Sequence, residues 1–215
     1  MTIENLVGII PPPAAPFGTF SGPWEPIEAQ LGTRLPDDYK DFVRVYGHGD
    51  LMGFIGIHVP ASWSPYMRLV QEARATAEAF RDAEDLPFPM WPSPGGLLPF
   101  GKTDLGDTLF WLTRGPPADW KVVVMGRDPP ETFDCDMTDF LARVARGEVS
   151  AGNFPDDLEA GEMVFEPIPS ATSPRRLRLL AENPAGDSFS VSWRFGPYGT
   201  EMGVSTCRLR DDPFG

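Results

Sequence analysis

The clearest β-sheet signal in the sequence is the stretch Gly96-Leu-Leu-Pro-Phe-Gly-Lys-Thr-Asp-Leu-Gly-Asp-Thr-Leu-Phe-Trp-Leu-Thr113. It holds two short apolar runs, Leu97–Phe100 and Thr108–Thr113, which are separated by a turn rich in aspartate and glycine. Aspartate bonds its own backbone in such turns, and glycine supplies the positive φ that they need. A third run, Trp120–Met125, is rich in β-branched residues. The three runs together predict an antiparallel meander.

Apolar residues recur at helical spacing on both sides of this meander. They predict helices over residues 21–32, 35–46 and 64–81 before it and over residues 136–147 after it. A loose alternation over residues 51–59 predicts one further strand. Each helix has a single apolar stripe, and a sheet face is the natural place to bury it. The predicted fold class is therefore α+β, with a mostly antiparallel sheet flanked by helices.

The C-terminal part of the chain changes character. Residues 151–174 are rich in proline and glycine, and apolar and polar residues then alternate strictly over 188–195, as in a half-buried strand. Residues 176–180 and 202–209 flank that strand as two more. We therefore predict four parts: an N-terminal arm over 1–20, the α+β domain over 21–150, a connection over 151–174, and a three-stranded β extension over 175–215. Three strands are marginal alone, so the extension is expected to pack on the main domain or on a partner.

Charge is the strongest global signal. The chain has 18 Lys and Arg against 31 Asp and Glu, a net charge of −13. The surplus lies in residues 1–165, with 12 basic and 25 acidic side chains, whereas residues 166–215 have six of each. Such a surface disfavours nucleic acid and anionic membranes, and it attracts basic proteins. Solubility alone is an alternative explanation of the same charge.

The cysteines and the N-terminus bear on location. Cys135 and Cys207 match no metal or redox spacing, which favours two free thiols in a reducing compartment. The short apolar patch Leu6–Ile10 follows Glu4, has no Lys or Arg before it, and ends in three prolines. It is typical of neither a signal peptide nor a membrane span. The expected location is the cytoplasm.

The meander also contains the letters of a phosphate-binding loop. Gly96 to Thr103 match the pattern GxxxxGK[ST], in which a strand delivers a glycine-rich turn to the N-terminus of a helix. Here the preceding residues 86–94 are rich in proline, the four variable positions are Leu-Leu-Pro-Phe, and a β-like run follows. We therefore predict no nucleotide site at this position.

Other catalytic patterns are weak. The two histidines, His48 and His58, have no metal-binding spacing, and no serine elbow is present. The carboxylate pairs Asp104/Asp107 and Asp134/Asp136 could serve acid–base or metal chemistry, but turn and cap roles explain both. The sequence predicts no catalytic residue, no metal site and no cofactor.

Several short motifs occur in an order that resembles the SUKH superfamily over about residues 20–150. The residues that carry the resemblance are Trp24, Leu35, Pro36, Tyr46, Gly47, Gly49, Pro99, Phe100, Gly101 and Gly106. Members of the superfamily include a yeast regulator of cell-wall synthesis and many bacterial immunity proteins against polymorphic toxins. The resemblance implies an α+β fold without a catalytic centre, which acts by binding another protein.

Three functional hypotheses follow. The favoured one is a cytoplasmic immunity protein whose acidic face occupies the basic cleft of a toxin, such as a nuclease. Its candidate contacts are clustered or turn carboxylates: Asp82, Glu84, Asp85, Asp104 and Asp107. The second hypothesis is a regulatory scaffold that binds an endogenous partner through residues 166–215. The third is a hydrolase or a nucleotide-binding enzyme.

Overall fold

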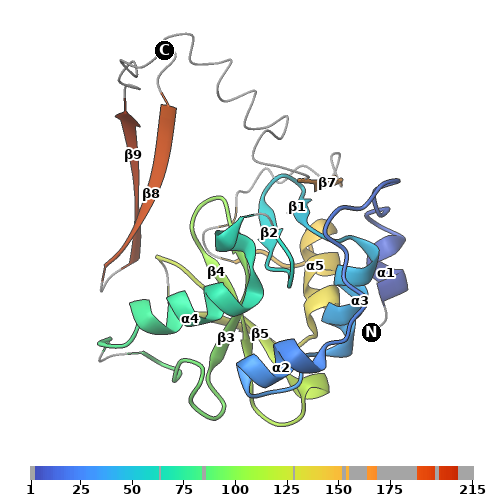
Figure 1. The fold of residues 1–215 in the computed structure, drawn as a ribbon, viewed down its shortest axis with the longest axis horizontal. Helices are drawn as coiled ribbons and strands as arrows, with labels where there is room; N and C mark the ends of the chain where they lie inside the picture. The colour runs from blue at the N-terminus through green and yellow to red at the C-terminus, as the bar shows by residue number, and fades with distance from the viewer. Residues whose placement is uncertain are drawn as a thin grey trace.

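A single antiparallel sheet of seven strands organises the described residues, in the order β6-β5-β4-β3-β2-β1-β7 (Figure 1). The structure is a computed structural model that describes residues 3–62, 64–83, 86–127, 129–151, 154, 164–168, 188–196 and 199–207. The strands of the sheet are β1 (Gly49–Leu51), β2 (Ile55–Ile57), β3 (Leu97–Thr103), β4 (Thr108–Leu112), β5 (Lys121–Met125), β6 (Glu131–Phe133) and β7 (Phe165–Pro167). The α-helices are α1 (Ile3–Val7), α2 (Glu25–Leu31), α3 (Asp37–Val45), α4 (Leu69–Ala79) and α5 (Met137–Ala145). The predicted α+β class is confirmed.

The predicted meander forms the centre of this sheet. β3 pairs with β4 and β4 with β5, so that Leu98, Trp111 and Val122 lie side by side on three strands. The register of β3 and β4 shifts between Pro99 and Gly101, where a bulge accommodates a proline that cannot donate a ladder hydrogen bond. A Cβ on Gly101 would lie 2.8 Å from a carbonyl oxygen of β2, so glycine permits the close pairing of β2 and β3.

The two faces of the sheet are covered differently. Trp111 and its neighbours lie on one face, where apolar side chains from all five described α-helices complete one continuous core. Phe110 and Val123 lie on the opposite face. The partly buried side chains of Phe88 and Met90, from the proline-rich segment before β3, pack against that second face.

Helices α3 and α5 begin close to their predicted positions. α3 buries Tyr39, Phe42 and Val43, the stripe that its helical spacing predicts. α5 begins after Asp136, whose side chain accepts a hydrogen bond from the backbone N–H of Asp139 at 2.7 Å. An aspartate at this position satisfies one of the N–H groups that have no partner within the helix.

The prediction of one strand over residues 51–59 is wrong. The chain forms two short strands, β1 and β2, which pair with each other across a tight turn. Met52 and Gly53 take positive φ values of 56° and 59° in that turn. β1 also pairs with β7 on its other side, and the backbone N–H of Met52 donates to Val164 at 2.8 Å. The N–H of Phe54 donates to the carbonyl of Leu51 at 3.0 Å, so a local turn ends β1 and divides the expected strand in two.

The prediction of one helix over residues 64–81 is wrong at its start. Pro65–Met67 form a 3₁₀ turn, Arg68 is extended at φ −88° and ψ 120°, and α4 begins only at Leu69. Arg68 is extended because Val59 bonds the backbone on both sides of it: Val59 donates to Met67 at 2.9 Å and accepts from Leu69 at 3.1 Å. This bridge thus overrides the local helical spacing.

Both ends of the chain add elements to the predicted plan. Leu6 of α1 and the nearby Ile10, which lie in the expected arm, are fully buried. β7 lies in the expected connection and pairs with β1. In the expected extension, β8 (Ser188–Gly196) and β9 (Gly199–Cys207) form an antiparallel hairpin, with Trp193 opposite Met202. The third expected strand, over residues 176–180, lies outside the described residues.

Candidate functional site

The motif residues around Gly47 and Gly49 close the chain onto itself. A Cβ on Gly47 would overlap the carbonyl oxygen of Phe17, and one on Gly49 would overlap the backbone of β7 and the ring of Phe165. Gly47 also has a φ of +71°, which favours glycine. These two glycines therefore allow an N-terminal segment and β7 to approach the end of α3, and their role is structural.

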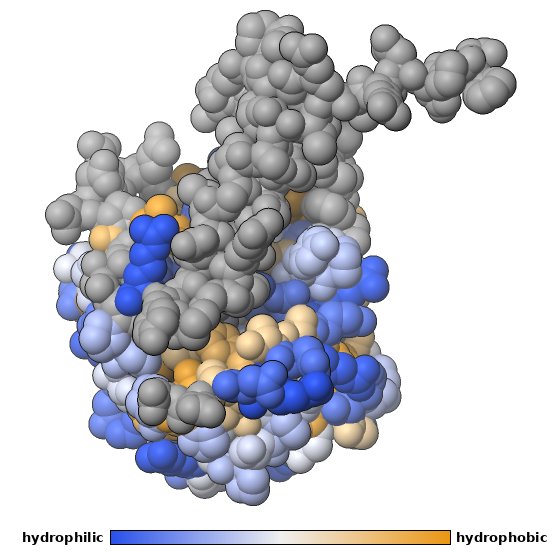
Figure 2. Space-filling view, turned by 90° about the vertical axis from the view of Figure 1, so that its left-hand side faces the viewer, coloured by the Kyte–Doolittle hydropathy of each residue, from blue (hydrophilic) through white to orange (hydrophobic). Residues whose placement is uncertain are grey.

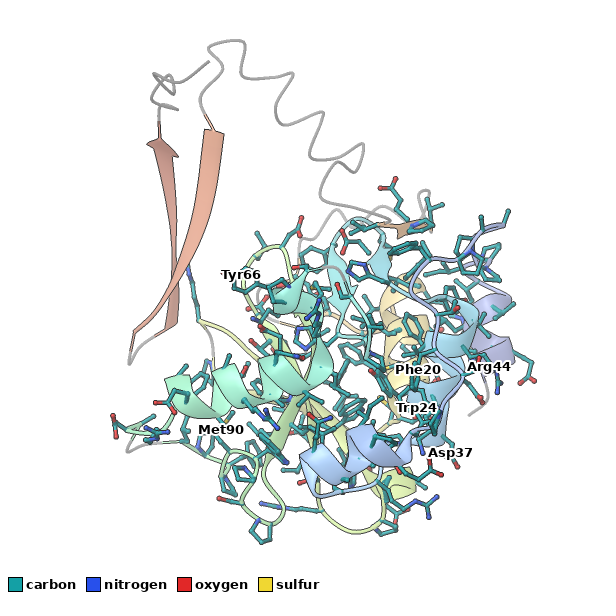
Figure 3. All side chains as sticks on the ribbon, viewed as in Figure 1. Phe20, Trp24, Asp37, Arg44, Tyr66 and Met90 are labelled. Carbon is teal, nitrogen blue, oxygen red and sulfur yellow. The ribbon has the colours of Figure 1, made fainter. Side chains whose placement is uncertain are left out.

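The other motif residues also have structural roles within the fold. Trp24 packs edge-on against Phe20 and Tyr39, with ring centroids 4.8 Å and 5.8 Å apart (Figure 3). The hydroxyl of Tyr46 donates to the carbonyl of Ile10 at 2.6 Å. Gly106 has a φ of +93° in the turn between β3 and β4. The remaining motif residues are all buried: Leu35, Pro36, Pro99, Phe100 and Gly101.

The two histidines are buried in the interior of the domain. The Nδ1 of His48 lies 3.1 Å from the carbonyl of Ile168, and its Nε2 lies 3.3 Å from the hydroxyl of Ser62. His58 is fully buried, and its carbonyl accepts a hydrogen bond from the hydroxyl of Tyr39 at 2.7 Å. Burial lowers the pKa of both imidazoles, and for His58 the charge of Lys102 lowers the pKa further. Both histidines are therefore neutral groups of the folded interior.

The residues that match the phosphate-binding-loop pattern lie in a strand. Seven of the eight residues, Leu97–Thr103, form β3, which is paired with β2 on one side and β4 on the other. Their backbone N–H groups are therefore part of a sheet and cannot curl around a phosphate. The Lys102 ammonium forms an ion pair with the buried carboxylate of Glu72 on α4. In this strand Lys102 joins a helix to the sheet.

The candidate contact carboxylates have different positions. Asp82 is exposed beyond the end of α4, and Asp104 is exposed in the turn between β3 and β4. Asp107 is only 2% exposed, and its carboxylate accepts a hydrogen bond from the hydroxyl of Thr103 at 3.0 Å. The expectation that Asp107 is a partner contact is thereby corrected, because this side chain holds the turn together from within. Glu84 and Asp85 lie outside the described residues.

A groove of about 770 Å³ lies between α4 and the proline-rich segment before β3. Its apolar lining includes Phe80, Phe88, Met90 and Trp91, and we call it the α4 groove. Met90 lies beside α4 in Figure 3, and Figure 2 shows apolar residues bordered by hydrophilic ones on the corresponding side of the molecule. Arg74, Glu78 and Arg81 also line the groove, so that apolar and charged side chains share its surface, as they do in protein-binding interfaces.

A second pocket, of about 380 Å³, lies where α3 and α5 begin. Its apolar lining comes from Leu35, Pro36, Trp111, Pro116, Pro117, Ala118, Trp120 and Met137, and its charged lining from Arg34, Asp37, Asp38 and Asp136. One arginine and three aspartates give this lining a formal charge of −2. We call it the Asp38 pocket. No sequence pattern had identified it, because its parts are far apart along the chain.

Two carboxylates of the Asp38 pocket converge on the first turn of α5. The N–H of Thr138 donates to Asp38 at 3.0 Å, and the N–H of Asp139 donates to Asp136 at 2.7 Å. Burial raises the pKa of Asp38, and the negative charge of Asp136 raises it further, whereas the N–H groups of Thr138 and Tyr39 oppose the rise. The protein therefore holds two like charges close together in a partly buried place.

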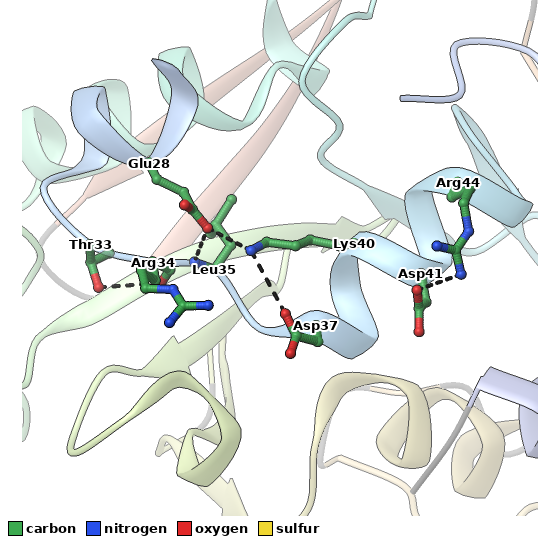
Figure 4. A network of polar contacts seen from close by, with 8 residues as sticks. All are labelled: Glu28, Thr33, Arg34, Leu35, Asp37, Lys40, Asp41 and Arg44. Atoms are coloured by element: carbon green, nitrogen blue, oxygen red, sulfur yellow. Dashed lines mark hydrogen bonds and ion pairs between the residues drawn. The ribbon is translucent and has the colours of Figure 1, made fainter. Parts of the chain in front are cut away.

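A polar network at the start of α3 adjoins this pocket (Figure 4). Lys40 bonds Glu28 at 2.7 Å and lies 3.8 Å from Asp37. Glu28 also accepts a hydrogen bond from the N–H of Leu35 at 2.9 Å. Although burial acts to raise it, the pKa of Glu28 is lowered by the Leu35 N–H and by Lys40. Counted as formal charges, Lys40 and Arg34 together equal Glu28 and Asp37, which leaves a charge of −2 that corresponds in number to Asp38 and Asp136.

The motifs and the fold agree with a comparison against known families. A family model described as SUKH_6, SMI1-KNR4 cell-wall, matches residues 23–141. The chain belongs to this SUKH family. The match includes α2 to α4, β1 to β6 and the first half of α5, and so contains both the α4 groove and the Asp38 pocket. No curated protein and no solved structure was found to match the chain.

Two further properties of the described residues concern metal binding and membrane crossing. No group of three or more His, Cys, Asp or Glu side chains that could hold a metal ion occurs among them. None of the described helices has both the length and the apolar character that a membrane crossing requires.

Proposed function

We propose that this SUKH protein is a non-catalytic immunity protein, which binds a basic toxin domain in the cytoplasm and blocks it. The α4 groove is the observation that carries the proposal. Its apolar side chains Phe80, Phe88 and Met90 are half-buried and line the groove beside exposed charged residues of α4 and its C-terminal end. The exposed Asp82 lies just beyond the end of α4. Apolar anchors with a polar rim are the usual composition of a binding interface.

Charge supports a basic partner. The 25 acidic side chains within residues 1–165 outnumber the 12 basic ones, so this part of the chain attracts cationic proteins over distances of about a Debye length. We propose Asp82, Glu84, Asp85 and Asp104 as contacts that accelerate association. Asp107 is not among them, because it is buried.

Rescue of growth tests the proposal. Cells that express toxins encoded beside this gene are made to co-express the protein, and one cognate toxin should lose its effect. Phe80→Glu places a charge in the α4 groove and should abolish rescue, whereas Val164→Glu, at a side chain that is 51% exposed on the β7 side of the sheet, should leave rescue intact. Circular dichroism checks that both variants fold. Failure to neutralise any neighbouring toxin, together with capture of an endogenous protein, would favour the regulatory scaffold.

The salt dependence of binding tests the electrostatic part. The Asp82→Asn/Asp104→Asn double variant should associate with the toxin about tenfold more slowly at low ionic strength. At high ionic strength its rate should approach that of the unaltered protein, because salt screens exposed charges. An association rate that does not depend on salt would exclude a role of the acidic surface.

A further inference from the structure

The Asp38 pocket combines flat apolar walls with surplus negative charge. Trp120, Pro36 and Pro117 provide rigid apolar surfaces, and Asp38 and Asp136 provide the carboxylates. Such a composition is complementary to a long side chain with an apolar stem and a cationic end. The volume of about 380 Å³ lies at the lower end of ligand pockets, which is enough for one side chain and too little for a folded element.

We propose that the Asp38 pocket receives an arginine side chain of a protein partner, whose guanidinium faces Asp38 and Asp136 while its stem lies against Trp120. The inference rests on the proposed function, since it names how a basic partner would be anchored. It places the anchor at a site separate from the α4 groove.

Arginine fits this pocket better than other cations. Its guanidinium is planar and weakly hydrated, stacks on aromatic rings, and bonds carboxylates through several N–H groups. A lysine ammonium is a compact and strongly hydrated charge, which gains less from tryptophan and proline walls. A divalent metal ion prefers a shell of oxygen ligands, whereas most of the residues that line this pocket are apolar.

Backbone N–H groups at the start of α5 hold the two carboxylates in place before any partner binds. Asp38 and Asp136 are fixed by the N–H groups of Thr138 and Asp139, so little side-chain freedom remains to be lost on binding. Two like charges held together also repel each other, and a cation between them would relieve that repulsion. The pocket is therefore preorganised for a positive group.

Trp111 also lines the same pocket. Its indole N–H is buried and has no acceptor among the described residues. This N–H is closed to solvent and is not a contact of the bound arginine. Because the ring of Trp111 lines the pocket, its N–H signal nevertheless reports on binding there.

A peptide titration tests the inference without the toxin. The probe is N-acetyl-arginine methylamide, added to the full chain labelled with ¹⁵N, and the readout is the indole N–H signal of each tryptophan. The signals of Trp111 and Trp120 should shift and saturate at millimolar concentrations, and Trp120→Phe identifies one of them. The neutral isostere N-acetyl-citrulline methylamide should cause no saturable shift. Equal shifts with citrulline, or no saturable shift with arginine, would overturn the inference.

Two variants of α3 locate the bound cation. Asp38→Asn removes the charge but can still accept from Thr138, and it should weaken arginine binding about tenfold. Asp41→Asn is the matched control on the same helix, because Asp41 forms an exposed pair with Arg44 and does not line the pocket. It should bind arginine as the unaltered protein does. Equal losses in both variants would show a general charge effect and would refute the site.

The inference and the proposed function can fail separately. If the protein neutralises a toxin while Asp38→Asn binds that toxin with unchanged affinity, the arginine pocket is wrong and the function stands. If arginine binds in an Asp38-dependent way and no toxin is neutralised, the pocket stands and the function is wrong.

Discussion

The backbone N–H of His48 donates a hydrogen bond to the carbonyl oxygen of Phe17 at 2.6 Å. The same oxygen would overlap with a Cβ on Gly47, and Gly47 has a φ of +71°. The carbonyl of His48 in turn accepts from the N–H of Ile168 at 3.1 Å. One residue therefore joins an N-terminal segment and a segment near residue 168 to the end of α3, and only glycine beside it leaves enough room.

Gly47→Ala is expected to be strongly destabilising. The substitution combines an unfavourable φ with a clash against backbone, and we expect a loss of about 3 kcal/mol or more in the free energy of unfolding. Gly32→Ala is the matched control, because Gly32 has a φ of +67° but no atom within 4 Å of its Cβ position. It should cost about 1 kcal/mol. Urea unfolding measures both, and similar losses would contradict the importance of the Phe17 contact.

Phe165→Ala tests whether β7 belongs to the core. The ring of Phe165 is 3% exposed and lies 5.1 Å from Tyr46 and 6.0 Å from Phe42, centroid to centroid. Its truncation should cost about 3–5 kcal/mol. Val164→Ala, at the preceding and half-exposed position, should change the stability by less than about 0.5 kcal/mol. Should denaturation give equal midpoints for the two variants, β7 contributes no core packing.

Asp38→Asn should not destabilise the protein at neutral pH. Because the pKa of Asp38 is raised in the folded state, its ionisation opposes folding at pH values above that pKa. This opposition fades as the pH falls towards the pKa of the unfolded chain. Asparagine lacks the charge, so the variant should be as stable as the unaltered protein or more stable, by up to about 1 kcal/mol at pH 7. The difference in the free energy of unfolding between the two proteins should vanish at pH 4. Unfolding curves at pH 4 and pH 7 measure it, and a markedly less stable variant at pH 7 would contradict the argument.

His58 should make the protein sensitive to mild acid. Burial lowers its pKa far below the usual range, so the folded state excludes the proton that the unfolded state binds below about pH 6.5. The contribution of His58 to stability is complete above that pH and is lost as the pH falls further. The free energy of unfolding should fall by up to about 1.4 kcal/mol per pH unit for this group. His58→Leu should reduce the slope by that amount, while His48 keeps its own share; an unchanged slope would mean that His58 titrates normally.

Lys102→Ala should affect stability and not nucleotide binding. The ammonium is the ion-pair partner of Glu72, whose side chain is 5% exposed, so its removal leaves a buried charge and should cost about 1–3 kcal/mol. Adding Glu72→Gln should recover part of the loss, because no buried charge then remains. Calorimetry with ATP should detect no saturable binding to the unaltered protein. Saturable binding that Lys102→Ala abolishes would restore the phosphate-loop interpretation.

Local patterns predicted the centre of the sheet and two helices well. The meander follows from apolar runs with Asp/Gly turns, and α3 from its stripe of Tyr39, Phe42 and Val43. The errors lie where a bridge or a turn interrupts an apolar pattern. The bridge from Val59 holds Arg68 out of a helix, and the turn at Met52 and Gly53 divides the expected strand into β1 and β2. The spacing of the apolar residues indicates neither interruption.

The candidate site was harder to predict than the fold. Asp37 and Asp38 suit the first turn of one helix and Asp136 caps another, so each carboxylate has a sufficient local explanation. Only the packing of α3 against α5 brings Asp38 to Thr138, 100 positions further along the chain. Asp107, in contrast, was expected at the surface because a turn residue is normally exposed, and its bond from Thr103 holds it inside.

The outermost strands of the seven-stranded sheet are short, which limits strand pairing between this sheet and another protein. β6 and β7, at the two borders of the sheet, have three residues each, and β7 ends in a proline that lacks an N–H group. So short a border gives an added strand few groups to pair with, and it discourages copies of the molecule from stacking into fibrils. Recognition through an added backbone strand is thereby disfavoured at the two borders of the seven-stranded sheet, where side chains must select the partner instead.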